Sequence, residues 1–284
     1  DSVYRIDTRD RSVAAFFLPD PRSLDSPRGL SVTEDGSEVW VTSHDADRVY
    51  VLDGATGGLK ATIDLPWGSG PYSVALSRPD AATGRQKWAL VTLHRANALA
   101  IIDTASRALT PLGEVFVAPH GIVWTDDGTS AWVSHLLVTD EHAQLTRVDV
   151  AGATPRVATR VTAFAATPQN GPQLTQADAA KNVAEGGYVN FRGHPAQIPA
   201  ATGLRQVWLP AQYHNMHGDG VSPDSTVQMS LRRLDLGTRT VLNADKIVLT
   251  AASVHNPTQG HNNPAWLGWG WDATVSGAVD IGFA

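Results

Sequence analysis

The sequence predicts an all-β fold, a β-propeller built from four-stranded antiparallel blades. The first observation is an apolar strand that ends in aspartate and recurs at residues 3–7, 49–53, 99–103, 145–149 and 231–235. The second is the spacing, because the first three steps between these aspartates are 46, 50 and 46 residues long. The last step is longer by about 40 residues, which indicates an insertion in an otherwise regular repeat.

The third observation is a common order of strands and turns inside each repeat. The first full repeat has a strand at 27–32, a turn at 34–36, a strand at 39–42, the aspartate-ended strand at 49–53, a glycine-rich turn at 54–58 and a last strand at 59–65. The third full repeat begins in the same way, at 119–124, 126–128 and 131–134. Such a meander cannot bury both faces alone, so we expect the repeats to stack around an axis rather than along a solenoid.

The whole chain, residues 1–284, is predicted to be one propeller domain that supplies about five to six blades of a seven-bladed ring. Residues 1–18 fit the last two strands of a blade and residues 277–284 fit an innermost strand, so we expect a longer natural protein. A fourth blade is placed at 196–249. An irregular insertion is expected at about 167–191 and an irregular tail at about 250–275.

Composition excludes several classes of function. The formal charge of −6 and the pI near 5.9 argue against nucleic acid or an anionic membrane as the main partner. No apolar run is long enough to insert into a membrane, and the first residues lack the pattern of a signal peptide, so we expect a soluble chain. The absence of cysteine excludes disulfides, thiolate nucleophiles, cysteine-bound zinc and covalently attached haem on this chain.

The repeat resembles that of the bacterial YVTN-type β-propellers. The matching segments are 27–32, the Asp35-Gly36 turn, 39–42 and 49–53, with Trp40 where that family usually has tyrosine. Residues 208–235 are also similar to a blade of large secreted propellers associated with di-haem cytochrome c peroxidase-like domains. This second resemblance implies a periplasmic or extracellular bacterial protein with a protein partner, such as a c-type cytochrome. Any haem would then belong to the partner or to sequence outside this chain.

Candidate site residues gather on one predicted face, at the mouth of the propeller channel. Alignment of the repeats puts Arg28, Tyr72, His120 and His194 at one position, at the start of the innermost strand. The loop between the second and third strands carries His44, His94, His135 and the pair His214 and His217. Seven of the ten histidines therefore map to one face, and histidine is the commonest metal ligand.

These residues divide into two predicted sets. The ligand-binding set is Arg28, Tyr72, His44, His94 and His135, and the metal-binding set is His120, His194, His214 and His217. Copper, zinc or iron are the metals expected at imidazole ligands, and calcium is an alternative near Asp219 and Asp224. A single histidine in a polar loop is more often a hydrogen-bonded turn residue than a ligand.

Three functions remain open from the sequence. The first is a secreted propeller that binds a partner or ligand on its histidine-lined face, in a redox or metal-related setting. The alternative is a metal-dependent propeller enzyme of lyase or hydrolase type, although no nucleophile elbow, phosphate loop or zinc-protease helix is present. The third is a scaffold without a site. The repeated aspartates are predicted to form turns, and Trp40, Trp132 and Trp208 are predicted to pack between blades.

Overall fold

The computed structural model describes residues 2–17, 26–80, 83–136, 142–152, 154–165, 187–191, 196–197, 206–215, 227–235 and 240–248. Within these ranges every regular element is a β-strand. A search of the same residues for an apolar helix of membrane-spanning length found none.

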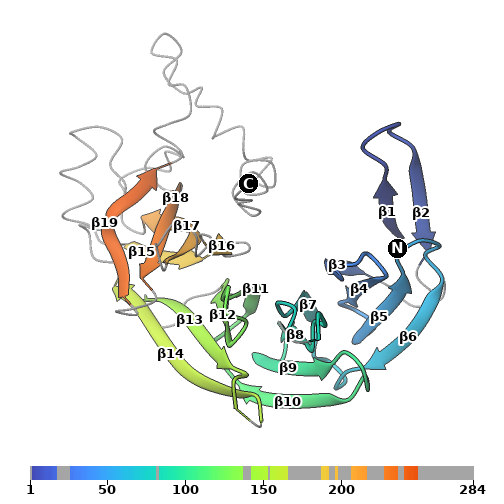
Figure 1. Ribbon diagram of the computed structural model, residues 1–284. Coiled ribbons are helices and arrows are strands. Elements are labelled where there is room, and N and C mark those ends of the chain that lie inside the picture. The colour runs from blue at the N-terminus through green and yellow to red at the C-terminus, as the bar shows by residue number, and fades with distance from the viewer. Residues whose placement is uncertain are drawn as a thin grey trace. The chain divides into compact units, whose positions relative to one another are not determined.

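The strands form successive sheets, most of them four-stranded (Figure 1). A two-stranded sheet contains β1 (Ser2–Ile6) and β2 (Val13–Phe17). The next contains β3 (Pro27–Val32), β4 (Glu38–Ser43), β5 (Arg48–Asp53) and β6 (Leu59–Asp64). It is followed by β7 (Pro71–Leu76), β8 (Trp88–Leu93), β9 (Ala98–Asp103) and β10 (Leu109–Glu114).

A further four-stranded sheet contains β11 (Pro119–Trp124), β12 (Ser130–His135), β13 (His142–Asp149) and β14 (Arg156–Ala165). The last sheet contains β15 (Gly187–Phe191), β16 (Ala196–Gln197), β17 (Gln206–Asn215), β18 (Val227–Asp235) and β19 (Thr240–Val248). These antiparallel meanders confirm the predicted all-β fold, that of a β-propeller. The number of blades stays a prediction.

The fourth blade differs from its predicted limits. Strand β15 lies within the segment assigned to the insertion and pairs with β17, so this sheet begins before residue 196. The rest of that segment, residues 167–186, and the predicted tail at 250–275 lie outside the described residues.

The chain divides into two compact units. The first comprises residues 1–131 and 149–157, and it holds the β1–β2 sheet, the β3–β6 blade and the β7–β10 blade. The second comprises residues 132–148 and 158–284, and it holds the sheet of β15 to β19.

The middle strands of the first unit are buried on both faces. In β5 the four residues between Arg48 and Asp53 are all buried, and β9 has the same pattern. Their near-continuous apolar sequence follows from this position, because a blade is covered by a neighbour on each side. Trp40 of β4 is fully buried in the core between the β3–β6 and β7–β10 blades, together with Val51 and Val91. Trp132 is also buried, whereas the side chain of Trp208 is not described.

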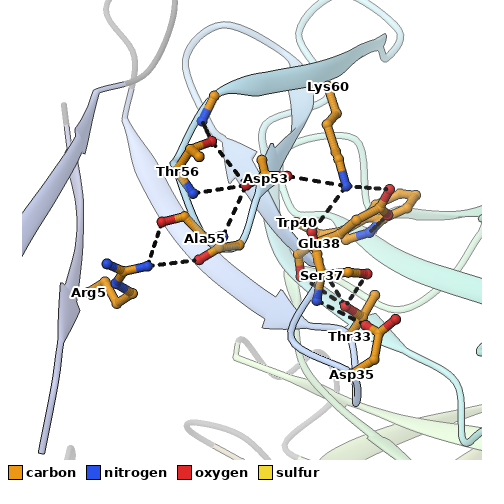
Figure 2. A network of polar contacts seen from close by, with 12 residues as sticks. Arg5, Thr33, Asp35, Ser37, Glu38, Trp40, Asp53, Ala55, Thr56 and Lys60 are labelled. Atoms are coloured by element: carbon orange, nitrogen blue, oxygen red, sulfur yellow. Dashed lines mark hydrogen bonds and ion pairs between the residues drawn. The ribbon is translucent and has the colours of Figure 1, made fainter.

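Two of the repeated aspartates, Asp53 and Asp103, cap turns, as predicted. Oδ1 of Asp53 accepts hydrogen bonds from the backbone N–H of Ala55 (3.1 Å) and Thr56 (2.8 Å) and from the Thr56 hydroxyl (2.9 Å), as Figure 2 shows. Asp103 accepts the same three kinds of bond in the next blade. Donation by Thr56 lowers the pKa of Asp53, because these bonds stabilise the carboxylate.

A polar network ties the blades together at the end that carries these turns (Figure 2). Nζ of Lys60 lies 3.8 Å from Glu38 and 3.6 Å from Asp53, and the indole N–H of Trp40 donates to Glu38 at 3.1 Å. Arg107 of the next blade donates to Glu38 at 2.6 Å and stacks over the Trp40 ring, with Cζ 4.7 Å from its centroid. One glutamate thus joins two blades.

A buried threonine hydroxyl joins the blades at the other end. The backbone N–H of Gly29 donates to Oγ1 of Thr42 (2.9 Å), and the Thr42 hydroxyl donates to the carbonyl of Tyr72 in the next blade (2.8 Å). A Cβ atom on Gly29 would lie 2.6 Å from that carbonyl oxygen, so only glycine fits here. The two inner strands are therefore held in close backbone contact.

The same bridge recurs one blade later. The backbone N–H of Ser73 donates to Oγ1 of Thr92 (2.9 Å), and the Thr92 hydroxyl donates to the carbonyl of His120 (3.2 Å). Each threonine fixes the carbonyl of the residue that follows proline in the next inner strand. We call these two contacts the threonine bridges.

Replacement of Thr42 by valine tests the first bridge. Thr42→Val keeps the side-chain volume but leaves the Gly29 N–H and the Tyr72 carbonyl without this partner, so we expect the free energy of unfolding to fall by about 1–3 kcal/mol. Urea denaturation measures the change, with Thr62→Val on the exposed position of β6 as the control. Equal stability of the two variants would show that the bridge contributes nothing.

Candidate functional site

Four aromatic side chains gather at the threonine-bridge end of the first unit. His44 follows β4, Tyr72 lies in β7, His94 follows β8 and His120 lies in β11. The Tyr72 ring centroid is 4.2 Å from that of His120, 5.3 Å from that of His94 and 6.3 Å from that of His44. His94 is 6.3 Å from His44 and 6.2 Å from His120. We call these four residues the His–Tyr cluster.

Strand register explains why these residues meet. Pro71 at the start of β7 pairs with Leu93 at the end of β8, and Pro27 pairs with Ser43 in the preceding blade. The residue after each proline and the residue after each second strand therefore lie at the same end of a blade. Three successive repeats supply the cluster from these two positions.

His94 is a neutral imidazole held in one orientation. Its Nδ1 lies 3.3 Å from the carbonyl oxygen of Pro119, which can only accept, so Nδ1 carries the hydrogen. Burial lowers the pKa of His94, and electrostatic repulsion from His44, Arg95 and Arg28 lowers it further, against the opposing effect of the Pro119 carbonyl. Nε2 of His94 is therefore an acceptor.

His44 is oriented through a carboxylate. Its Nδ1 lies 3.1 Å from Oδ1 of Asp45, and the same oxygen accepts a hydrogen bond from Arg95 at 2.6 Å. The hydrogen bond from His44, followed by that from Arg95, lowers the pKa of Asp45, so this carboxylate is ionised. Nδ1 of His44 is the donor in the hydrogen bond to Asp45, and the other ring nitrogen, Nε2, takes no part in this bond.

Arg28 borders the cluster as an exposed cation. It shares the repeat position of Tyr72 and His120, as the sequence predicts, and lies close enough to lower the pKa of His94. Among the described residues Arg28 forms no ion pair, whereas Arg95 pairs with Asp45 and Arg48 pairs with Asp64 at 2.9 Å. This charge is available to an acceptor group from outside.

Trp67 is a site residue that the sequence analysis missed. It lies between β6 and β7, at the same end of the blades, and the residue is 97 % exposed. Asp47 holds the loop beneath it by accepting hydrogen bonds from the N–H of Gly68 (2.6 Å), the N–H of Gly70 (2.8 Å) and the Ser69 hydroxyl (3.1 Å). A fixed loop thus presents an indole that packs on nothing in the described part of the chain.

The Trp67 loop is continuous with the cluster. Gly70 has a φ of +55°, and a Cβ atom there would lie 2.6 Å from Cγ of Arg95, so the arginine side chain packs directly on this glycine. Arg95 in turn bonds to Asp45, the partner of His44. The loop is two residues longer than its counterpart after β10, and this extra length was the signal in the sequence.

His135 does not share the position of His44 and His94. It is the last residue of β12, one position earlier in the repeat, and it is fully buried with Nε2 2.9 Å from the Thr146 hydroxyl. Side chains alternate along a strand, so a shift of one position turns the ring to the other face. His135 is therefore buried and out of register with His44 and His94, and its place in the ligand-binding set stays a prediction.

The predicted metal set is only partly described. His120 belongs to the cluster and is 8 % exposed, and the backbone of His214 lies in β17 opposite Tyr188 and Val227. His194 and His217, and Asp219 and Asp224 of the calcium alternative, lie outside the described residues. Within the described ranges no group of three or more histidine, aspartate or glutamate side chains is arranged to hold a metal ion.

Comparisons with solved structures show the fold. Hydrazine synthase from Kuenenia stuttgartiensis, a β-propeller protein, is 17 % identical with a TM-score of 0.65, over 87 % of this chain and 60 % of that chain. A protein from Lactobacillus plantarum is 17 % identical with a TM-score of 0.52, over 86 % and 64 %. U3-55K is 9 % identical with a TM-score of 0.54, over 87 % and 59 %. This chain thus spans about three fifths of these structures.

No family model matches the chain, and no curated protein matches its sequence. The resemblances to YVTN-type propellers and to propellers associated with di-haem cytochromes stay predictions. At these identities the similar structures establish the β-propeller fold alone.

The titration of His94 tests the electrostatics of the cluster. We expect its imidazole NMR signals to titrate below the ordinary pKa of 6.5, because burial and the neighbouring Arg95 and Arg28 disfavour the imidazolium. The unfolded chain, in which the His94 pKa is higher, binds the imidazole proton more tightly than the folded chain. The contribution of His94 to the free energy of unfolding therefore falls as the pH drops below 6.5. Arg28→Gln should raise the His94 pKa, whereas Arg78→Gln, at the opposite end of β7, should leave it unchanged. A wild-type midpoint at or above 6.5 would contradict this description.

Proposed function

We propose that this protein is a binding β-propeller whose partner docks on the His–Tyr cluster and the neighbouring Trp67. The observation that carries the proposal is the convergence of His44, Tyr72, His94 and His120 from three repeats beside a fully exposed indole. The threonine bridges hold the backbone under Tyr72 and His120, so these two side chains need little ordering when a partner binds.

The composition of this end favours a protein as the partner. Tryptophan, tyrosine and arginine are enriched at the centres of protein interfaces, and lysine is depleted. Trp67, Tyr72, Arg28 and Arg95 occupy this end. The two lysines described in the first unit, Lys60 and Lys87, lie at the opposite end, next to the aspartate turns. Arginines such as Arg78 and Arg107 lie at the aspartate-turn end as well, so the contrast between the two ends rests on the lysines and on the exposed Trp67.

Trp67 supports the same conclusion by its shape. An indole exposed on both faces is removed from water only by a partner that encloses it. Small ligands are usually enclosed by a concave site on the protein, whereas a projecting aromatic residue fits a pocket on the partner. Arg28 supplies a charge for an acceptor group at the rim of that pocket.

The setting of this interaction rests on the sequence resemblance. It implies a periplasmic or extracellular protein and a c-type cytochrome as the partner, and both stay predictions. A cytochrome partner would carry covalent haem, which provides a direct assay in the experiment below.

Photocrosslinking tests the docking surface. We place p-benzoylphenylalanine at position 67 and, as the matched control, at position 59, at the opposite end of β6. In an extract of exported proteins from the native organism, position 67 should give one dominant adduct that position 59 does not. Peroxidase staining for haem and mass spectrometry of the adduct then identify the partner and decide whether it is a cytochrome.

Affinity for the identified partner separates a site from a chance contact. Tyr72→Ala and Arg28→Ala should each weaken binding about tenfold, because truncation of a central interface residue costs more than about 1 kcal/mol. Arg78→Ala, at the opposite end, should bind normally. The proposal fails if both positions capture the same proteins, or if the Tyr72 and Arg28 variants bind like the wild type with unchanged urea denaturation.

A metal site is the second candidate. Its support is the anchoring of Nδ1 in both His44 and His94, which leaves the Nε2 atoms of the pair to act as ligands. Metal-binding histidines commonly donate their other ring hydrogen to a carboxylate or carbonyl in this way. Two imidazoles fall short of the three protein ligands of a catalytic zinc site, so this pair alone would make a two-ligand site.

Calorimetric titration of the dialysed protein with zinc chloride or copper chloride tests this candidate. Binding should be lost in His44→Ala and in His94→Ala, because each removes one of the two oriented nitrogen ligands. His261→Ala, which has no place in the repeat, serves as the control. Metal affinity that is equal in all three variants would rule out a site on this pair.

A further inference from the structure

The charged side chains beside the His–Tyr cluster leave one cation without a carboxylate. Arg95 donates to Oδ1 of Asp45 at 2.6 Å, and the two residues hold the same position of their blades, each directly after a cluster histidine. Asp47 is occupied by the Trp67 loop, whose N–H groups and serine hydroxyl bind both of its carboxylate oxygens. Arg28 is exposed, and no carboxylate in the described ranges lies within ion-pair distance of it. Its guanidinium is therefore open to an anion from outside.

The backbone of β3 holds Arg28 beside the cluster. A register shift interrupts strand pairing near the start of β3 and of β7, and Arg28 and Tyr72 lie within these two shifts. Irregularities of this kind re-aim a side chain and are frequent next to binding sites. A Cβ atom at Gly29, the next residue, would lie 2.6 Å from the Tyr72 carbonyl oxygen, so the chain after Arg28 touches the next blade. Arg28 is also close enough to His94 to lower its pKa, so backbone contact and charge give the same position.

The Tyr72 hydroxyl is a second donor at the same repeat position. The Tyr72 ring contacts the three histidines of the cluster, but its hydroxyl forms no hydrogen bond with a described residue. A phenol has one hydrogen to donate and a guanidinium has five, and both bind an ionised oxygen more strongly than a neutral one. The residues that follow proline in two neighbouring blades thus offer donors for one anionic group.

We propose that Arg28 and Tyr72 bind one carboxylate of the docked partner, either an aspartate or glutamate side chain or a C-terminus. The inference rests on the proposed function, because it names the group that the partner presents to the His–Tyr cluster. A carboxylate is planar and accepts two parallel N–H bonds from one guanidinium, and it keeps lone pairs for the phenol hydrogen. Its single negative charge matches the one unpaired arginine.

Charge argues against phosphate, the other anion that arginine commonly binds. A phosphate group carries a charge of about −1.5 to −2 at neutral pH and is typically bound by several cations. Here Asp45 neutralises Arg95 and the His94 imidazole is neutral, which leaves Arg28 as the unpaired charge. The formal charge of −6 on the whole chain also repels a broadly acidic surface. We therefore expect the partner to present a single carboxylate rather than a phosphate or an acidic patch.

NMR titration of the full chain with small carboxylates tests the proposal. One probe is aspartate blocked by acetyl and amide groups, which keeps the side-chain carboxylate, and the other is N-acetylalanine, which ends in a free carboxylate. Blocked asparagine and N-acetylalanine amide are the matched neutral controls, at pH 7.5 and constant ionic strength. The Arg28 Nε–H and Tyr72 ring signals should shift in a saturable way with a carboxylate and not with its amide. The probe that binds more tightly identifies the source of the carboxylate.

Three variants assign the binding to the two donors. Arg28→Gln and Tyr72→Phe should each raise the dissociation constant of the tighter probe at least about tenfold, because each removes a hydrogen-bond donor to a charged group. Arg78→Gln changes an arginine at the opposite end of β7 and should bind like the wild type. Backbone amide spectra that match the wild type show that each variant is folded.

Two results would overturn the proposal. In the first, neither carboxylate shifts the Arg28 signal more than its neutral amide does, and in the second, both the Arg28 and the Tyr72 variant bind the probe like the wild type. If position 67 still captures a partner in the crosslinking experiment, docking there stands and only the carboxylate step is lost. Carboxylate binding without capture at position 67 would instead contradict the docking proposal and leave a small carboxylate as the ligand of Arg28 and Tyr72.

Discussion

The threonine bridges are the contacts on which the candidate site depends. A hydroxyl at full burial can accept from its own blade and donate to the next, so one side chain satisfies two backbone groups that would otherwise be buried without partners. The carbonyls of Tyr72 and His120 are the groups it fixes. The rings on those residues are thereby held at contact distance, 4.2 Å between centroids, without any direct hydrogen bond between them.

The two ends of the blades in the first unit have different chemistry for a structural reason. At one end the chain must reverse tightly between the third and fourth strands, and aspartate oxygens cap that turn while Lys60 and Arg107 neutralise the acidic groups around Glu38. At the other end the connection between β6 and β7 has six residues, two more than the connection between β10 and β11. It therefore has room for Trp67, which is exposed.

The strands were predictable because the repeat has a strong period. The limits of β3 and β11 agree with the sequence to the residue, since proline begins each strand and a glycine turn follows it. The same alignment of the repeats also predicted that Tyr72, His94 and His120 lie at one end of the blades. The alignment placed His135 at the position of His44 and His94, although it lies one position earlier in the repeat. The longer loop after β12 concealed this shift. The longer connection between β6 and β7 was a signal for the Trp67 loop, but the exposure of the indole could not be predicted, since it depends on what the rest of the chain leaves uncovered.

The repeat position after proline combines two tasks in one residue. Its carbonyl receives the threonine bridge, while its side chain faces the site, and the chain carries arginine, tyrosine and histidine there in successive blades. The bridge uses only the backbone carbonyl of this residue, so its own side chain is free to vary without loosening the blades. Gene duplication of such a unit yields copies that diversify in recognition while the scaffold stays the same, and the same separation makes these positions suitable for redesigning specificity.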